Sequence, residues 1–157
     1  MPVFTEAEAL VLILRLQAGG KAVVFTDGIF DLLHPGHLRC LQRARRLGGA
    51  LLVGVNSDRS VRAAKGPNRP IVPAQERAEI LAALACVDGV VIFDEETPLR
   101  LMAALRPDIL AQCTDRADEA IVEARGDQVI RIPVESGYST RAILEKIRST
   151  PKPPALL

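Results

Sequence analysis

The sequence is poor in aromatic residues and has almost no net charge, and both features limit the classes of function it can have. Of its 157 residues only 3% are Phe, Tyr or Trp, and the formal net charge is +1. A chain with no basic surplus and few rings for stacking bases is not expected to bind nucleic acid. Its one basic cluster is interpreted as a solvated helix face: Arg39, Arg43, Arg45 and Arg46.

Cysteine and long hydrophobic runs are also scarce. The three cysteines, Cys40, Cys86 and Cys113, are scattered and odd in number. This favours neither a disulfide framework nor a zinc site, and it indicates a reducing compartment. No signal peptide is recognisable, and the apolar stretch at residues 9–16 contains Arg15 and is too short to cross a bilayer. We therefore expect a cytoplasmic protein without a membrane partner.

The pattern that is present predicts a single α/β domain over residues 1–149. With 48% hydrophobic residues, a chain of this length can form one substantial core but hardly two. A capping-box pattern at Thr5 and Glu8 opens a helix within residues 1–20. Apolar strands then alternate with helices, which predicts a Rossmann-like doubly wound parallel sheet of about five strands. The strands are expected at residues 22–25, 50–56, 89–93, 108–111 and 128–132, and the proline-rich tail at 150–157 is expected to be disordered.

The chain has only two histidines, His34 and His37, and they lie one helical turn apart where the first strand passes into a helix. The first turn of a helix offers unpaired N–H groups and the positive end of its dipole, and Pro35 there gives up no needed donor. Gly28 and Gly36 allow a bulky anion to approach the backbone. Alone, either histidine is more simply a satisfied, partly buried side chain, but the pair in this setting predicts a phosphate site.

The glycines of this segment do not form a familiar nucleotide motif. No Lys-Ser or Lys-Thr follows them, and G-x-G-x-x-G is absent. A P-loop and a dinucleotide-binding fingerprint are therefore excluded. In a doubly wound sheet, ligands bind beyond the carboxyl ends of the strands, where the strand order reverses. Four segments that follow predicted strands are expected to meet there: residues 26–31, 56–58, 112–115 and 136–140.

The stretch His34-Pro35-Gly36-His37, preceded by Thr26-Asp27-Gly28-Ile29-Phe30-Asp31, resembles the H-x-G-H signature of the nucleotidylyltransferase superfamily. Members of this superfamily join a nucleoside monophosphate to a phosphate-bearing acceptor and release pyrophosphate. The chain is particularly similar to the adenylyltransferases of ADP-heptose synthesis, which act on D-glycero-β-D-manno-heptose 1-phosphate. The likeness spans about residues 21–148 and includes Val53-Gly54-Val55-Asn56-Ser57-Asp58, Lys65-Gly66 with Arg69-Pro70-Ile71, Gln75-Glu76-Arg77, and Gly137-Tyr138-Ser139-Thr140.

The resemblance and the expected geometry together imply roles for individual residues. His34, His37 and Lys65 are the expected catalytic residues, with His37 stabilising the transition state at the α-phosphate and Lys65 closing over the phosphates. The nucleotide would be bound by Thr26, Asp27, Gly28, Ile29, Phe30, His34, Gly36, His37, Asn56, Asp58, Lys65, Gly137, Ser139 and Thr140. The acceptor would contact Asp31, Arg69, Gln112 and Asp115. Mg²⁺ is expected as an ion held by the phosphates, with no dedicated metal site on the protein.

Simpler roles stay open for four of these residues. Asp31 is alternatively a support for the phosphate loop or a helix cap, and Arg69 either binds a phosphate or anchors its loop. Ser139 is explained equally by helix capping. Lys65 is alternatively an ordinary exposed lysine.

The chain departs from the heptose pattern mainly at one loop. Where the heptose enzymes typically have Lys-Gly-Gly-Asp-Tyr after the fourth strand, it has Gln112-Cys113-Thr114-Asp115-Arg116. Asp27 stands where Asn is usual, Tyr138 replaces a smaller residue, and Arg141 replaces a threonine. We expect these changes to affect the acceptor pocket and to leave the phosphate site intact.

The leading hypothesis is an adenylyltransferase that transfers AMP from ATP to a heptose-type sugar 1-phosphate. A cytidylyltransferase for a small phosphorylated alcohol or a phosphonate is a second possibility, and a non-catalytic nucleotide-binding module is a third. The expected partners are a nucleoside triphosphate and a phosphorylated acceptor. A homodimer is common among the relatives.

Overall fold

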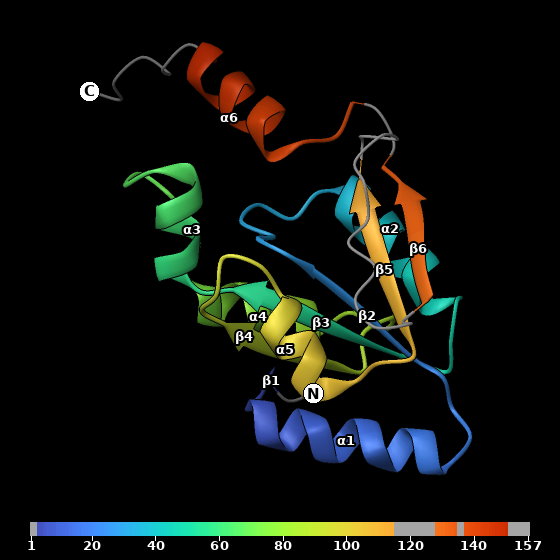
Figure 1. Cartoon of the computed structure of the whole chain (residues 1–157). Coiled ribbons are helices and arrows are strands. Elements are labelled where there is room, and N and C mark those ends of the chain that lie inside the picture. The colour runs from blue at the N-terminus through green and yellow to red at the C-terminus, as the bar shows by residue number, and fades with distance from the viewer. Residues whose placement is uncertain (1–2, 115–127, 135–136, 151–157) are drawn as a thin grey trace.

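A six-stranded parallel sheet with helices on both faces forms the body of the protein (Figure 1). The computed structural model describes residues 3–114, 128–134 and 137–150. Its strands are β1 (Val3–Phe4), β2 (Val23–Gly28), β3 (Ala50–Asn56), β4 (Gly89–Phe93), β5 (Ile109–Thr114) and β6 (Gln128–Pro133). Its helices are α1 (Glu6–Ala18), α2 (Pro35–Arg45), α3 (Asp58–Lys65), α4 (Ala74–Ala82), α5 (Leu99–Leu105) and α6 (Thr140–Ser149). The doubly wound, Rossmann-like architecture predicted from the sequence is confirmed.

Two apolar clusters cover opposite faces of the sheet, because successive side chains of a strand point to opposite sides. One cluster joins Val24 to Leu41 of α2 and Leu81 of α4. The other joins Phe25 to Ile13 of α1 and Leu101 of α5. Burial on both faces explains why the strands are continuously apolar in sequence.

The strand order is β1-β4-β3-β2-β5-β6, so the chain reverses direction across the sheet at β2. From β2 it proceeds through β3 to β4 on one side, and then returns to place β5 on the other side of β2. Such a reversal opens a crevice at the carboxyl ends of the strands. In Figure 1, α6 lies beyond the arrowheads of β5 and β6, at this end of the sheet.

The ends of several elements differ from the sequence prediction. Strand β1 was not expected, since its two residues are too few to show a pattern, but it adds a sixth strand beside β4. Gln112, Cys113 and Thr114, expected in a loop, continue β5 because they stay paired with β6. The capping box at Thr5 is confirmed, with the Thr5 N–H donating to the Glu8 carboxylate at 2.8 Å. None of the helices in the described part of the chain is long and apolar enough to cross a membrane.

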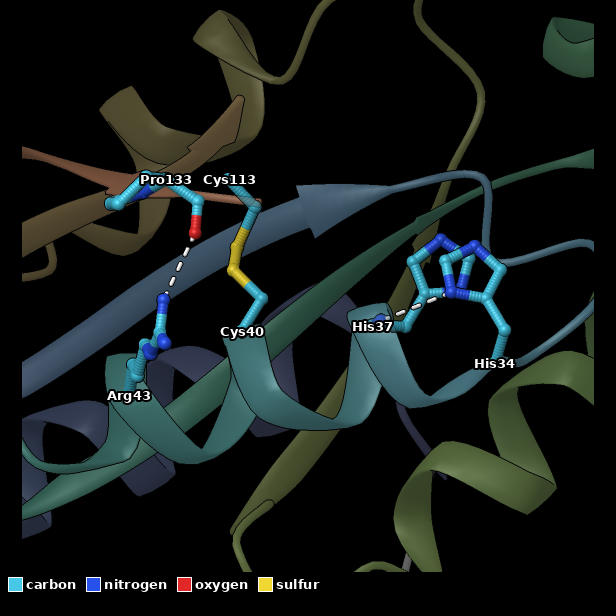
Figure 2. Close-up of a disulfide and its surroundings, with 6 residues drawn as sticks. All are labelled: His34, His37, Cys40, Arg43, Cys113 and Pro133. Atoms are coloured by element: carbon cyan, nitrogen blue, oxygen red, sulfur yellow. Dashed lines mark hydrogen bonds between the residues drawn. A yellow bond between two sulfur atoms is a disulfide. The ribbon is translucent and has the colours of Figure 1, made fainter. Parts of the chain in front are cut away.

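The expectation that the cysteines stay unpaired is wrong for two of them. Cys40 of α2 and Cys113 of β5 form a disulfide across 73 residues of sequence, with 6.2 Å between their Cα atoms (Figure 2). Scattered positions in the sequence converge because α2 packs against the β5–β6 side of the sheet. Cys86 is free. The inference of a reducing compartment from the cysteine pattern therefore loses its support.

Candidate active site

The histidine pair forms the start of α2. His34 is the N-cap, and its Nδ1 atom accepts a hydrogen bond from the His37 backbone N–H at 3.3 Å. The two rings are stacked, with 3.7 Å between centroids and 18° between planes (Figure 2). Because Nδ1 of His34 accepts, the proton of the neutral ring is on Nε2, which is then a donor for a ligand.

Both rings favour the neutral form. Burial lowers the pKa of His34, and burial together with the neighbouring His34 lowers the pKa of His37 to about 4. A neutral imidazole has one donor and one acceptor nitrogen. Nδ1 of His37 is buried and has no hydrogen-bond partner among the described residues. At neutral pH the pair therefore presents hydrogen-bond donors rather than two cations.

Two cavities meet at this pair. The larger, of about 780 Å³, lies between the loop after β2, the connection after α3, and α6; its lining includes Lys65, Arg69 and Arg141. The smaller, of about 290 Å³, lies between α2, the end of β5 and the segment before α6. The residues that line both cavities include His37, Ser139 and Thr140. The predicted phosphate-binding groups are thus gathered where the cavities join.

Glycine is required at two points around these cavities. A Cβ atom at Gly36 would lie 2.9 Å from Cβ of Tyr138 and 3.1 Å from Nδ1 of His34. Gly137 has a φ of +92°, a backbone conformation that lets the chain turn into the Ser139 cap of α6. Ser139 accepts from the Ala142 N–H at 3.0 Å, so the capping role considered for it is confirmed. Its position on both cavities leaves a ligand role open as well.

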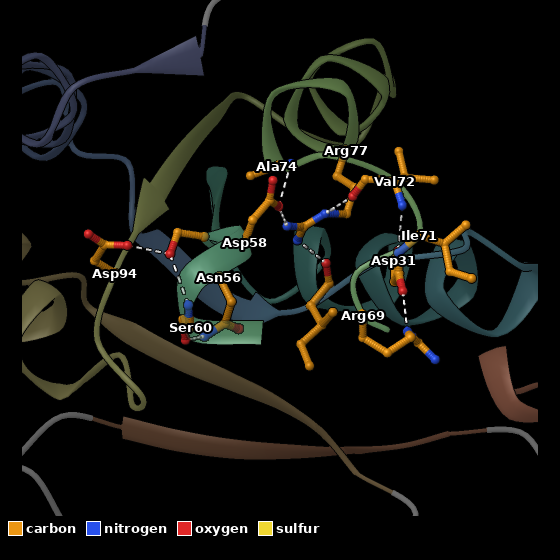
Figure 3. Close-up of polar contacts among 12 residues, drawn as sticks. Asp31, Asn56, Asp58, Ser60, Arg69, Ile71, Val72, Ala74, Arg77 and Asp94 are labelled. Atoms are coloured by element: carbon orange, nitrogen blue, oxygen red, sulfur yellow. Dashed lines mark hydrogen bonds and ion pairs between the residues drawn. The ribbon is translucent and has the colours of Figure 1, made fainter. Parts of the chain in front are cut away.

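Asp31 supports the connection between α3 and α4 (Figure 3). Its carboxylate accepts from Arg69 Nε at 2.5 Å and from the backbone N–H groups of Ile71 and Val72 at 2.7 and 2.9 Å. Its exposed fraction is 2%. Of the roles considered for Asp31 the geometry favours the support role, while Arg69 both anchors this connection and lines the larger cavity.

A buried arginine that the sequence reasoning did not single out ties the site together (Figure 3). Arg77 is 1% exposed and donates to the carbonyl oxygens of Val72 at 2.8 Å and Ile29 at 2.5 Å. A further guanidinium nitrogen donates to Asp58 Oδ1 at 2.8 Å. Arg77 thereby fixes the loop after β2 relative to α3 and α4. The one signal in the sequence was the Gln75-Glu76-Arg77 match, whose role a linear pattern does not reveal.

Four of the residues predicted to bind the nucleotide line neither of the two cavities: Thr26, Asn56, Asp58 and Gly137. Asp58 also accepts from the Ala74 N–H at 2.8 Å, so its contacts serve the start of α4. Asn56 donates from Nδ2 to Ser60 Oγ at 3.1 Å, and Thr26 is 1% exposed within β2. Thr26, Asn56 and Asp58 thus belong to the scaffold of the site, and Gly137 makes the turn before α6. Gly28, Ile29, Phe30 and Gly36 do line the cavities, and Lys65, the last residue of α3, lines the larger one.

The predicted acceptor residues are not brought together. Gln112 lines a third, small cavity of about 190 Å³ with Asp27, Cys113 and Thr114, apart from Asp31 and Arg69. Burial raises the pKa of Asp27 to about 6. Asp115 lies outside the described residues. In the described part of the chain no three His, Cys, Asp or Glu side chains are grouped to hold a metal ion.

Comparison with known proteins agrees with this geometry. Residues 25–150 match the family described as cytidylyltransferase-like. The chain is 54% identical over 133 residues to the bifunctional protein HldE of Syntrophotalea carbinolica, which covers 82% of this chain and 27% of that protein. It is 48% identical over 149 residues to HldE of Koribacter versatilis, covering 92% of this chain and 31% of that protein. The chain thus spans less than a third of the length of these curated relatives.

A solved structure shares the fold. The lipopolysaccharide core biosynthesis protein of Thermoplasma volcanium superposes with a TM-score of 0.59 at 27% identity, covering 74% of this chain and 98% of that one. The family match includes the β2 to α2 segment with its histidine pair, and the pair lies at the strand reversal where such a fold binds ligands. The chain belongs to the cytidylyltransferase-like family of nucleotidyltransferases.

Proposed function

We propose that this chain transfers AMP from ATP to a sugar 1-phosphate of heptose type and releases pyrophosphate. The observation that carries the proposal is the convergence of donors at the junction of the two cavities. The N-terminus of α2 with its two imidazoles, the N-terminus of α6 with Ser139 and Thr140, and the ammonium group of Lys65 all border the larger cavity or its junction. Helix N-termini and neutral donors of this kind suit a polyphosphate.

The reaction needs no nucleophile from the protein. An oxygen of the acceptor phosphate attacks the α-phosphorus of ATP, a new P–O bond forms, and the bond to the β-phosphate oxygen breaks. The electron pair leaves with pyrophosphate. The protein therefore has to hold two anions in line and to stabilise the charge that develops at the α-phosphate and on pyrophosphate.

His37 is proposed for that stabilisation, because it is the one of the two histidines that borders both cavities. Its neutral ring donates to a phosphate oxygen without the cost of burying two adjacent cations. Lys65 is exposed at the end of α3 and is followed by Gly66, whose φ is +94°. Gly66 lets the chain turn directly after Lys65, and the ammonium group on the larger cavity would approach the β- and γ-phosphates.

Mg²⁺ is expected to enter with ATP. Among the described residues, the acidic side chains around the site are not grouped: Asp31 accepts three hydrogen bonds, Asp58 accepts two, Glu145 of the larger cavity accepts from Arg141, and Asp27 alone lines the smaller cavity. The chemistry of these side chains does not fit a dedicated metal centre. These side chains are compatible with an ion that is held mainly by phosphate oxygens.

The sugar acceptor is proposed from the relatives named HldE and from the resemblance to the heptose adenylyltransferases. The cytidylyltransferase alternative is favoured by one observation, the family match itself. Pyrophosphate release should therefore be measured with each of the four nucleoside triphosphates against a panel of sugar 1-phosphates and small phosphorylated alcohols. We expect activity with ATP and a heptose 1-phosphate, together with an equal amount of nucleotide-activated sugar.

Two other results would contradict this proposal. Activity confined to CTP and a phosphorylated alcohol would replace it with the cytidylyltransferase alternative. Tight nucleotide binding without product over the whole panel would identify a binding module.

A further inference from the structure

The disulfide joins the helix that bears the histidine pair to the end of a strand on the opposite wall of the smaller cavity (Figure 2). Cys40 lies three residues after His37 on α2, and Cys113 is the second-last residue of β5. Both sulfur-bearing side chains line that cavity. The Cα separation of 6.2 Å is within the ordinary range for a disulfide.

The two cysteines differ in their access to solvent. Cys113 is exposed at the end of the sheet, whereas Cys40 is only 4% exposed behind it. A reagent in solution can thus reach Cys113 first, and Cys40 can then react with it from within the protein. A second contact joins α2 to this side of the sheet, because Arg43 donates to the Pro133 carbonyl oxygen at 3.0 Å (Figure 2).

We propose that Cys40 and Cys113 form a reversible thiol–disulfide pair that sets the affinity of the nucleotide site. The oxidant is a low-molecular-weight disulfide such as glutathione disulfide. The Cys113 thiolate attacks it, its S–S bond breaks, and one glutathione thiolate leaves. The Cys40 thiolate then attacks Cys113 Sγ in the mixed disulfide and releases the second glutathione. Two electrons pass from the protein to glutathione disulfide, and the two protons appear on the released thiols.

The bond acts on the site through α2. When it is present, α2 and β5 are held together one helical turn from His37, and the wall of the smaller cavity is fixed. Reduction lets the two sulfur atoms separate to van der Waals contact and lets the start of α2 move relative to β5. Because binding to a preorganised site costs less ordering, the oxidised protein should bind ATP roughly 2- to 10-fold more tightly than the reduced protein. This part of the inference rests on the proposed nucleotide function, whereas formation of the bond does not.

The test uses the full chain, equilibrated in buffers with graded ratios of glutathione to glutathione disulfide. After acid quenching, free thiols are counted and the intact mass is measured. We expect three free thiols in the reduced protein and one, from Cys86, in the oxidised protein, consistent with the single free cysteine of the structure. Peptide mapping should find Cys40 joined to Cys113. Isothermal titration then gives the Kd for ATP of both forms.

Three variants complete the design. Cys86→Ser is the matched control and should keep both the disulfide and the redox dependence of ATP affinity. Cys113→Ser, at an exposed position, and Cys40→Ser should each bind ATP like the reduced protein under all conditions. Three free thiols in every buffer, or a bond that involves Cys86, would overturn the pair.

Equal ATP affinity of the two forms, or weaker binding by the oxidised form, would overturn its control of the site. Absence of ATP binding in both forms would refute the proposed function together with that control. The thiol count would still decide whether the pair forms.

Discussion

At neutral pH the natural protein, with Asp27, should be less stable than a variant with an uncharged side chain at this position. Asp27 lies near the end of β2, on the small cavity shared with Gln112, and burial raises its pKa from 3.8 to about 6. The folded state therefore binds this proton more tightly than the unfolded state. The stabilising contribution is complete below pH 3.8 and is lost as pH rises through about 6. A difference of about 2.2 pKa units corresponds to about 3 kcal/mol.

The perturbation is Asp27→Asn, which keeps the shape and removes the charge. Near pH 3.8 the variant and the natural protein should have the same free energy of unfolding. Between about pH 4 and 6 the variant should become the more stable of the two. Above that range the gain should level off at about 3 kcal/mol at most. His37 acts in the opposite sense, because its pKa is lowered from 6.5 to about 4. Its contribution is present above pH 6.5 and is lost as pH falls, so the variant should reveal this slope, which Asp27 otherwise offsets.

Urea unfolding at a series of pH values, under constant non-oxidising and non-reducing conditions, measures the difference directly. Glu96→Gln, at an exposed position, is the matched control and should give no comparable pH-dependent gain. A gain for Asp27→Asn that is the same at every pH would show that packing, and not ionisation, is responsible. A loss of stability at pH 8 would refute the reasoning outright.

Four other substitutions test the site. His37→Ala should lower pyrophosphate release about 10²- to 10³-fold with an unchanged circular dichroism spectrum, and near-normal kcat would remove His37 from the mechanism. His34→Asn should keep the cap of α2, because Asn is a good N-cap, but lose turnover; a large fall in melting temperature would instead assign the ring a structural role. Arg77→Met should cost about 3–5 kcal/mol in urea unfolding, since it leaves buried acceptors unpaired, and a loss below about 1 kcal/mol would contradict the network. Gln112→Lys should lower the pKa of Asp27 by placing a cation in its cavity, as followed by carboxyl NMR titration; an unchanged titration would separate the two side chains.

Most of the fold could be predicted because its determinants are local. Apolar runs such as residues 50–56 and caps such as Thr5 and Ser139 are legible in a few consecutive residues. The same holds for the histidine pair, where a strand, a proline and two glycines within one segment fix the geometry of the predicted phosphate site. Strand β1 was missed because its two residues are placed by pairing with β4 and not by their own pattern.

The features that escaped prediction depend on contacts across the fold. Cys40 and Cys113 are 73 residues apart, and only the docking of α2 brings them together. Arg77 looks in sequence like a solvent-exposed helix residue, yet its guanidinium is buried because carbonyl oxygens from two other segments and Asp58 surround it. The contacts of Asp58 with Ala74 and Arg77 escaped prediction for the same reason, since a carboxylate that follows a strand gives no sign in the sequence of which neighbours it will bind.

Several of the residues that depart from the heptose pattern lie close together in the structure. Asp27 lies on β2 and the consecutive residues Gln112, Cys113 and Thr114 lie on β5, yet together they line the small cavity of about 190 Å³. This chain has Asp27 where the heptose pattern has Asn and Gln112 where it has Lys, so an acidic lining replaces a basic one. The side chains of Cys113 and Thr114 fill space that the two glycines of the pattern would leave open. His37, Lys65, Ser139 and Thr140, in contrast, all border the larger cavity. The changes in this small cavity should therefore alter which acceptor is used, whereas the other two departures, Tyr138 and Arg141, line the smaller and the larger cavity and lie closer to the proposed triphosphate site.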